Sequence, residues 1–367
     1  MNIPFFNYPA VYNTYKNDFQ RVFEEIGSKG SFIMQSELLD FEKKIANYSN
    51  CKYAIGVGNA TDALEMLLAA SGIGFGDEVI ISTHTMIATA SAISANGAVP
   101  VPVECGSDHL IDPESILKEI NSKTSCIMPT QLNGRTAKMD DICNIAKEYG
   151  LKIIEDSAQA LGSKYNGQNA GTFDVGGCIS FYPAKVLGCL GDGGMILCNS
   201  KDLYDKLIMI RDHGRDPVSG DVVLWGRNSR LDNLQAAFLD YQFNNYENVI
   251  ERRRQIAEIY ENEISVLDEV VLPPSPKNND MHFDIFQNYE IEANERNTLK
   301  KYLYDNGIGT LIQWGGKGVH QFTKLGFKKS LPTSERIIDR MLLLPINMTI
   351  TDDEVKYVSD NINSFYS

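Results

Sequence analysis

The chain has 367 residues, 43% of them hydrophobic and 22% charged, a balance typical of a globular protein with a large core and about two domains. No run approaches the ~20 consecutive apolar residues of a membrane helix, and the start, MNIPFFNYPAVYN, lacks a signal-peptide pattern. The formal charge of −14 disfavours nucleic-acid binding, because an acidic protein repels a phosphate backbone. Seven scattered cysteines indicate reduced thiols and a cytoplasmic location.

The first half of the chain alternates short apolar runs with longer amphipathic stretches. The predicted strands are YAIGV, EVIIS, VPVPVE, SCIMPT and LKIIED. Before the last of them, Met139, Ile142 and Ile145 fall at helical spacing, and Gly150 stands where a helix cap belongs. Strands that alternate with helices predict a mostly parallel sheet covered on both faces, which binds ligands at the carboxyl ends of its strands.

The second half has a different pattern. Two more strand-like runs, GGCISFYP and GGMILCN, precede a long helical stretch that begins near Leu231. After a proline-rich segment come the strand-like FDIFQNYEIE, the helical ERNTLKKYLYDNG and two further helical runs. We place a domain boundary within the long helix, which predicts a large domain at residues 1–240 and a small C-terminal domain at residues 241–367.

The most informative motif lies at residues 152–194. It reads KIIEDSAQALGSKYNGQNAGTFDVGGCISFYPAKVLGCLGDGG. This segment resembles the DegT/DnrJ/EryC1/StrS family of sugar aminotransferases, which are fold type I enzymes dependent on pyridoxal phosphate (PLP). Stretches that agree in order and spacing include FEKKIANYSNCKYAIGVGNATDALEMLLAASGIGFGDEVI, NGAVPVPVE, WGRNSRLDNLQAA and LPTSERIIDRMLLLPIN. The resemblance implies a large domain with a mostly parallel seven-stranded sheet flanked by helices, and a smaller α+β domain.

Lys185 follows the apolar run CISFYPA, an unusual place for a residue type that is mostly exposed. A PLP enzyme needs a partly deprotonated amine, and burial near a cationic ring lowers the pKa of a lysine. The resemblance implies that Lys185 is the catalytic residue, which holds the cofactor as an imine and then moves a proton. The cofactor would pass between PLP and pyridoxamine phosphate.

Three further residues are assigned to the cofactor ring by the resemblance. Asp156 ends a predicted strand, where its carboxylate would keep the pyridine nitrogen protonated; capping the next helix is the alternative role. Gln159 resembles the residue that meets the ring hydroxyl. Met86 stands where the family has an aromatic ring, and packing in the core is an equally good reading of it. Glu155, beside Asp156, is expected to point the other way.

The cofactor phosphate needs hydrogen-bond donors. Ala60 and Thr61 follow a predicted strand and open a helix, and a helix N-terminus suits an anion. By resemblance Ser180 donates its hydroxyl to the same phosphate. Asn228 resembles the asparagine that reaches it from a neighbouring subunit, which implies a homodimer with shared active sites.

The family mostly transaminates keto sugars linked to a nucleotide diphosphate, with L-glutamate as donor, in amino-sugar biosynthesis for surface glycans or natural products. This chain departs from the family pattern at Gln35, at Gln131 and in the loop QWGGKGVH. In that loop His320 matches a family histidine. Trp314 and Lys317 have no counterpart, and we expect all three near the substrate, although an exposed lysine needs no ligand. Histidines 84, 109, 213 and 282 show no metal-ligand spacing, so no metal is expected.

Other functional classes fit less well. Sugar dehydratases of the same family carry a histidine at the lysine position, so Lys185 argues against that mechanism. GVGNAT lacks the third glycine of a dinucleotide-binding fingerprint, and no P-loop motif occurs. A non-catalytic sensor would not need to retain Lys185, Asp156, Gln159 and Ser180 together. Within the aminotransferases, the altered loop keeps a smaller phosphorylated ketone open as the alternative substrate.

Overall fold

A seven-stranded sheet forms the centre of the computed structural model, which describes residues 1–264, 266–277 and 281–367. Its strand order is β1-β9-β8-β5-β4-β2-β3. All of these strands except β9 run in the same direction, so the predicted mostly parallel sheet is confirmed. The strands are β1 (Tyr53–Val57), β2 (Glu78–Ser82), β3 (Val99–Val103), β4 (Thr124–Met128), β5 (Lys152–Asp156), β8 (Gly176–Ser180) and β9 (Gly194–Cys198).

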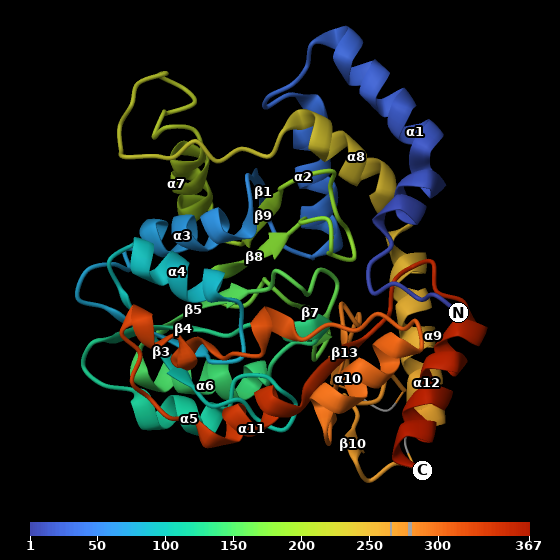
Figure 1. The fold of residues 1–367 in the computed structure, drawn as a ribbon. Coiled ribbons are helices and arrows are strands. Elements are labelled where there is room, and N and C mark those ends of the chain that lie inside the picture. The colour runs from blue at the N-terminus through green and yellow to red at the C-terminus, as the bar shows by residue number, and fades with distance from the viewer. Residues whose placement is uncertain (265, 278–280) are drawn as a thin grey trace.

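Helices cover both faces of this sheet (Figure 1). Val79 and Ile81 pack into one core together with side chains of the helices α3, α4 and α7, whereas Ile80 packs into a second core with α5 and α6. Because successive side chains of a strand point to opposite faces, two covered faces require the unbroken apolar runs seen in the sequence. The helices are α3 (Ala60–Ala70), α4 (Ile87–Ala95), α5 (Pro113–Glu119), α6 (Met139–Tyr149) and α7 (Lys201–Arg211).

The C-terminal part of the chain has its own core around the small sheet β10-β12-β13. Ile3 belongs to this core, so the start of the chain packs beside its end (Figure 1). A third sheet, β11-β6-β7, joins residues of both parts. The strands are β6 (Lys164–Tyr165), β7 (Gln168–Asn169), β10 (Val270–Val271), β11 (His282–Phe283), β12 (Tyr289–Ala293) and β13 (Met341–Leu344). The helices are α9 (Tyr246–Ile264), α10 (Arg296–Asp305), α11 (Pro332–Arg340) and α12 (Asp352–Tyr366).

The remaining helices lie near the N-terminus, before α9 and in loops. They are α1 (Tyr8–Lys29), α2 (Ser36–Tyr48), α8 (Asn233–Phe243) and the 3₁₀ turns η1 (Leu132–Gly134), η2 (Gln313–Gly315), η3 (Val319–Gln321) and η4 (Thr323–Leu325). None of the helices in the described ranges has the combination of length and hydropathy that a bilayer crossing requires.

The long helix expected from about residue 231 is two helices. Helix α8 ends at Phe243, and α9 begins at Tyr246. Asn244 and Asn245 lie between them, and their backbone amides donate to carbonyls three residues earlier, a turn geometry that asparagine favours. Helix α9 contributes Tyr260 to the core of the C-terminal part and Tyr246 to a further core that holds side chains of α2 and α8, so the domain boundary near residue 240 stays a prediction. The buried run MLLL forms β13, where the sequence predicted only helical runs.

A buried ion pair joins α2, α7 and β1. Arg211 Nη1 donates to Glu42 Oε1 at 2.6 Å, and the same carboxylate oxygen accepts the backbone N–H of Gly56 at 2.7 Å. Both charged side chains are more than nine-tenths buried. Removing one partner would leave the other charge buried without compensation.

Arg211→Met should therefore lower the free energy of unfolding by about 3–5 kcal/mol. The matched control is Lys201→Met, which breaks a pair with Asp205 on the exposed surface of the same helix and should have no measurable effect. Denaturant titrations of both variants and the wild type measure the difference. Equal small effects from the two variants would show that the buried pair does not stabilise this junction.

Candidate active site

A cavity of about 440 Å³ lies where β5 and β8 end and α3 begins. Of the eleven site residues predicted from the sequence, eight line this cavity: Ala60, Thr61, Met86, Asp156, Gln159, Ser180, Lys185 and Trp314. They come from segments as far apart as residues 60 and 314. The carboxyl-end location agrees with the general rule for parallel sheets.

Three predicted residues lie elsewhere. Asn228 and Lys317 are exposed. His320 is buried, and both of its ring nitrogens have partners, Thr83 Oγ1 at 2.6 Å and Glu335 Oε1 at 3.1 Å. A histidine held in this way joins η3 to the loop after β2 and has no free nitrogen for a ligand in the cavity.

The carboxylate of Asp156 is held in place by hydrogen bonds. Thr89 Oγ1 donates to Oδ2 at 2.6 Å, and the backbone N–H of Ala158 donates to Oδ1 at 3.2 Å. Cys178 Sγ lies 3.5 Å from Oδ1. The partners fix the orientation of the carboxylate while leaving it beside the cavity, where it can face a cationic group.

A short chain of hydroxyl groups extends from Asp156. Thr130 Oγ1 donates to Thr85 Oγ1 at 2.8 Å, and Thr85 and Thr89 share a hydrogen bond of the same length. These threonines were not predicted from the sequence. Their only signal is the i, i+4 spacing of residues 85 and 89 at the start of a helix, which is too common to identify a site.

Lys185 lies in the loop after β8. Gln287 holds this loop from the other side, because it accepts from the N–H of Val186 and donates to the carbonyl of Ala184, both at 2.9 Å. Burial lowers the pKa of Lys185 from 10.5 to about 8, although the carboxylate of Asp156 acts in the opposite direction. Part of the side chain faces the cavity, so the amine is both desolvated by its surroundings and accessible to a ligand.

The N-terminus of α3 opens onto the same cavity. Asn59 caps the helix by accepting the N–H of Asp62 at 2.9 Å, while Ala60 and Thr61 hold the first two helical positions, whose N–H groups have no acceptor within a helix. A Cβ atom at position 194 would lie 2.5 Å from the carbonyl carbon of Asn59, so Gly194 is required for β9 to pass this close. Free amides at a helix N-terminus suit a phosphate.

Gln131 and Glu155 are bonded within the fold. Gln131, which replaces a common family histidine, donates to Glu155 Oε2 at 2.5 Å and accepts the N–H of Ala137 at 2.7 Å. Burial raises the pKa of Glu155 to about 7. Neither Gln131 nor Glu155 lines the cavity, in agreement with the expectation that Glu155 points away from Asp156.

Trp314, in η2, lines the cavity from the C-terminal part of the chain. Its backbone has φ 47°, a left-handed conformation that costs a non-glycine residue free energy and is commonly found at functional sites. Its ring packs edge-on against His84, with ring centroids 5.4 Å apart. The neighbouring Gln313 donates to Asn133 Oδ1 at 2.8 Å, and the N–H of Asn133 donates to Gln159 Oε1 at 2.8 Å.

Comparison with known proteins identifies relatives along the whole chain. The model of the DegT/DnrJ/EryC1/StrS aminotransferase family matches residues 13–363. A pleiotropic regulatory protein of Geobacillus stearothermophilus is 38% identical over 100% of this chain and 99% of its own length. The dTDP-3-amino-3,6-dideoxy-alpha-D-galactopyranose transaminase of Aneurinibacillus thermoaerophilus is 37% identical over 99% of both chains.

A solved structure is also similar. The crystal structure of S. venezuelae DesV in complex with a ketimine intermediate is 33% identical in sequence and superimposes with a TM-score of 0.95. The similarity covers 100% of this chain and 99% of DesV. The overall fold is therefore shared along the whole chain.

The lowered pKa of Lys185 predicts a pH-dependent stability in protein freed of bound cofactor. Below pH 8 both the folded and the unfolded chain carry the proton, and the folded state bears the full cost of the buried charge. Between pH 8 and 10.5 the unfolded chain holds a proton that the folded chain has released, so stability rises with pH. Denaturant titrations should show the free energy of unfolding of the wild type rising relative to that of Lys185→Met across this range. A difference that stays constant with pH would contradict the lowered pKa.

Proposed function

The chain belongs to the DegT/DnrJ/EryC1/StrS aminotransferase family, and on this premise we propose that it transfers an amino group from glutamate to a keto sugar linked to a nucleotide diphosphate. The family resemblance and the fold type I architecture predicted from the sequence are confirmed. The enzyme is an aminotransferase, and its cofactor is PLP.

One observation carries the proposal: a lysine with a lowered pKa, an oriented carboxylate and an open helix N-terminus face a single cavity. These groups fit the three reactive parts of PLP. The amide groups of Ala60 and Thr61, with the hydroxyl of Ser180, would hold its phosphate. Asp156 would hold the proton of its ring nitrogen, and Lys185 would meet its aldehyde.

PLP supplies a conjugated ring that takes up the electron pair released when a bond to the amino-bearing carbon breaks. The protein must then move a proton, and Lys185 is suited to this. A pKa of about 8 keeps a substantial fraction of its Nζ neutral near physiological pH, so Nζ can both accept and return a proton. Asp156 remains fixed throughout, because Thr89 and Ala158 hold both of its oxygens.

The substrate proposal rests on the relatives and on the cavity. The transaminase that is 37% identical to this chain is named for a 3-amino sugar carried by dTDP. Trp314 supplies a flat apolar wall, a surface that suits a sugar ring or a nucleobase. We therefore propose a 3-keto sugar linked to a nucleotide diphosphate as the acceptor, with a smaller phosphorylated ketone as the alternative because the QWGGKGVH loop departs from the family.

Reduction with borohydride should attach the cofactor permanently to Lys185, because this is the amine that faces the cavity with a lowered pKa. Peptide mapping by mass spectrometry locates the label. Lys185→Ala should bind PLP only reversibly and lose turnover. A label on another lysine would contradict the assignment.

Purified enzyme with glutamate should aminate a dTDP-linked 3-keto sugar faster than a 4-keto isomer. Product formation is measured by mass spectrometry.

Trp314→Ala should raise KM for the sugar roughly 10-fold, equivalent to about 1.4 kcal/mol, and leave the half-reaction with glutamate nearly unchanged. The control is Lys317→Ala, in the same loop but exposed, which reports any general effect of altering the loop. Rapid amination of a small phosphorylated ketone, without turnover of any nucleotide sugar, would favour the alternative.

We also propose a homodimer with shared active sites. Asn228 lies outside the cavity of its own chain, in a projecting segment in which Trp225, Val222 and Val223 are exposed. An apolar projection of this kind is typical of a surface that a partner covers. This arrangement supports a role for Asn228 in the site of a second copy.

Mixing inactive Lys185→Ala chains with impaired Asn228→Ala chains tests this arrangement. After subunit exchange, a mixed dimer should hold one site with both changes and one with neither, so activity should partly return. Asn228→Ala alone should lose roughly 1–3 kcal/mol of transition-state stabilisation, the value of one hydrogen bond to a charged group. Full activity of Asn228→Ala, or no recovery after confirmed exchange, would contradict shared sites.

A further inference from the structure

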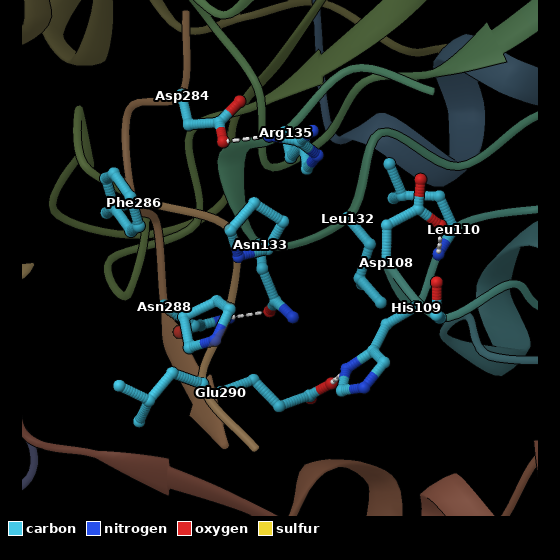
Figure 2. A pocket seen from close by; sticks show the side chains of 14 residues that line it. Asp108, His109, Leu110, Leu132, Asn133, Arg135, Asp284, Phe286, Asn288 and Glu290 are labelled. Atoms are coloured by element: carbon cyan, nitrogen blue, oxygen red, sulfur yellow. Dashed lines mark hydrogen bonds and ion pairs between the residues drawn. The ribbon is translucent and has the colours of Figure 1, made fainter. Parts of the chain in front are cut away.

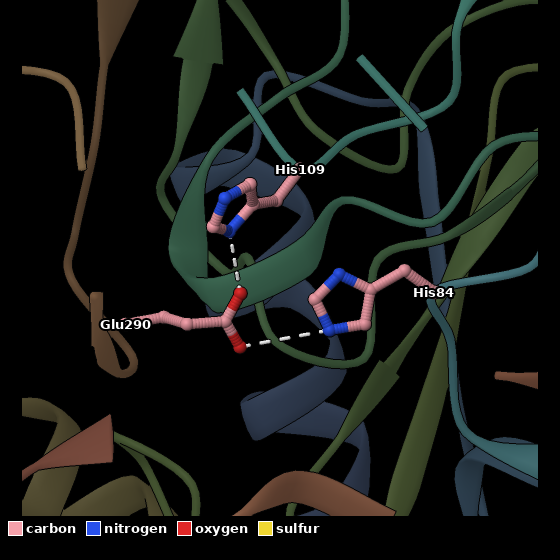
Figure 3. Close-up of side chains that lie close together, drawn as sticks. All are labelled: His84, His109 and Glu290. Atoms are coloured by element: carbon pink, nitrogen blue, oxygen red, sulfur yellow. Dashed lines mark hydrogen bonds and ion pairs between the residues drawn. The ribbon is translucent and has the colours of Figure 1, made fainter. Parts of the chain in front are cut away.

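Three buried side chains that could bind a metal meet behind Trp314, outside the proposed active site. His84 follows β2, His109 follows β3, and Glu290 lies on β12 of the small sheet (Figure 3). His84 and Glu290 are almost fully buried, and His109 is 9% exposed. One possible ligand atom from each residue lies within 4.8 Å of the other two.

The ring nitrogens of His84 are buried and poorly satisfied by the residues that the structure describes. Neither of its ring nitrogens makes a hydrogen bond among the described residues, although the side chain is only 1% exposed. Its Nε2 points toward Glu290 Oε2 across 3.6 Å, too far for a hydrogen bond (Figure 3). A buried polar group without a well-formed hydrogen bond is costly, so a ligand between His84 and Glu290 would satisfy this nitrogen better than the chain does.

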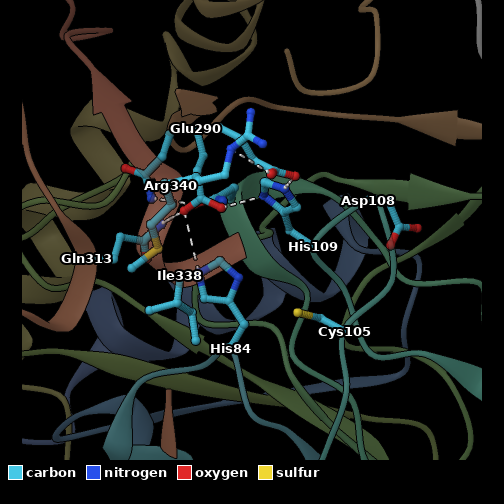
Figure 4. A network of polar contacts seen from close by, with 12 residues as sticks. His84, Cys105, Asp108, His109, Glu290, Gln313, Ile338 and Arg340 are labelled. Atoms are coloured by element: carbon cyan, nitrogen blue, oxygen red, sulfur yellow. Dashed lines mark hydrogen bonds and ion pairs between the residues drawn. The ribbon is translucent and has the colours of Figure 1, made fainter. Parts of the chain in front are cut away.

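The other two residues have the surroundings of metal ligands. His109 Nδ1 faces Glu290 Oε1 at 2.6 Å, while its opposite nitrogen, Nε2, is 3.2 Å from Glu292 Oε1 (Figure 4). Arg336 in turn donates to Glu292 at 2.7 Å. A carboxylate behind a metal-binding histidine is the usual second layer of a zinc site, because it orients the ring and fixes its tautomer.

We propose that His84, His109 and Glu290 form a binding site for a divalent transition-metal ion of the zinc type. Two imidazoles and one carboxylate are a ligand set that zinc uses, whereas magnesium and calcium require oxygen ligands. Metal–ligand bonds of about 2.0–2.1 Å in a tetrahedron place ligand atoms roughly 3.4 Å apart, close to the 3.6 Å between His84 and Glu290.

Binding requires one exchange. The proton that His109 shares with Glu290 leaves to solvent, and the ion takes its place between the two groups and His84. A small cavity of about 40 Å³, lined by His109 and Glu290, adjoins the cluster and has room for water (Figure 2). It provides a fourth coordination position and a path for the ion.

A hydrogen-bonded pair of His109 and Glu290 is the simpler alternative, and it accounts for those two side chains. It leaves His84 with only a 3.6 Å ion-pair contact to Glu290 and with ring nitrogens that form no hydrogen bond of good geometry, which a bound metal would satisfy. The ion would also join the loops after β2 and β3 to the small sheet, and so hold His84 against Trp314. The proposal does not depend on the substrate, because none of the three ligands lines the active-site cavity.

The test is metal binding by the PLP-loaded enzyme, treated first with chelator and then with zinc chloride. After desalting, atomic emission should find one zinc per chain in the wild type, and zinc should raise its melting temperature. His84→Phe keeps a ring against Trp314 but removes both nitrogens. This variant should bind no zinc and melt at the same temperature with and without it. The control His213→Asn changes an exposed histidine and should behave as the wild type.

A second readout covers the case in which His84→Phe does not fold. Glu290→Gln should lose zinc, and Glu292→Gln should weaken zinc affinity by about 10–100-fold, as expected when the support of a ligand is removed. Cobalt(II) in place of zinc should give the visible absorption of a four-coordinate ion in the wild type but not in Glu290→Gln. No zinc in the wild type, or equal zinc in the wild type and in the His84 and Glu290 variants, would overturn the proposal.

Discussion

The desolvation of one amine is the constraint on which the site depends. Lys185 loses its charge easily because the surrounding chain removes water from Nζ, and its pKa falls to about 8. The negative charge of Asp156 raises the pKa of Lys185 and so opposes this effect. Hydrogen bonds from other donors, including Thr89, hold the carboxylate in place. The sheet provides both conditions, because β5 and β8 are neighbours and end at the same edge.

The C-terminal part of the chain completes the site by holding loops of the large sheet. Gln287 fixes the backbone on both sides of Lys185. Gln313 contacts Asn133 and Glu290, both at hydrogen-bond distance, and Asn133 contacts Gln159 in the cavity. A continuous set of hydrogen bonds therefore links Gln159 in the proposed cofactor site to Glu290. Changes around Glu290 are expected to affect the position of Trp314 before they affect Lys185.

Much of this arrangement could be predicted from the chain alone. Unbroken apolar runs predicted the covered parallel sheet, and the motif around Lys185 predicted four residues that line the cavity: Asp156, Gln159, Ser180 and Lys185. These signals are local: a strand, the turn after it and the following helix lie within a few residues of one another. The strand β13 was missed, because an apolar run of this length fits either a helix or a strand. The break at Asn244 was missed because the stretches on both sides of it are helical.

The sequence by itself therefore determined the family, the fold class and most of the predicted residues that line the cavity, since each depends on short-range pattern. Only the tertiary structure decided the role of the histidines. His320 matched a family residue yet has both ring nitrogens bonded within the fold, whereas His84 and His109 show no spacing of interest but meet at Glu290, some 180 residues away from His109 in the chain. Contacts between distant segments follow from how the small sheet packs against the loops of the large sheet, and no local pattern in the chain encodes that.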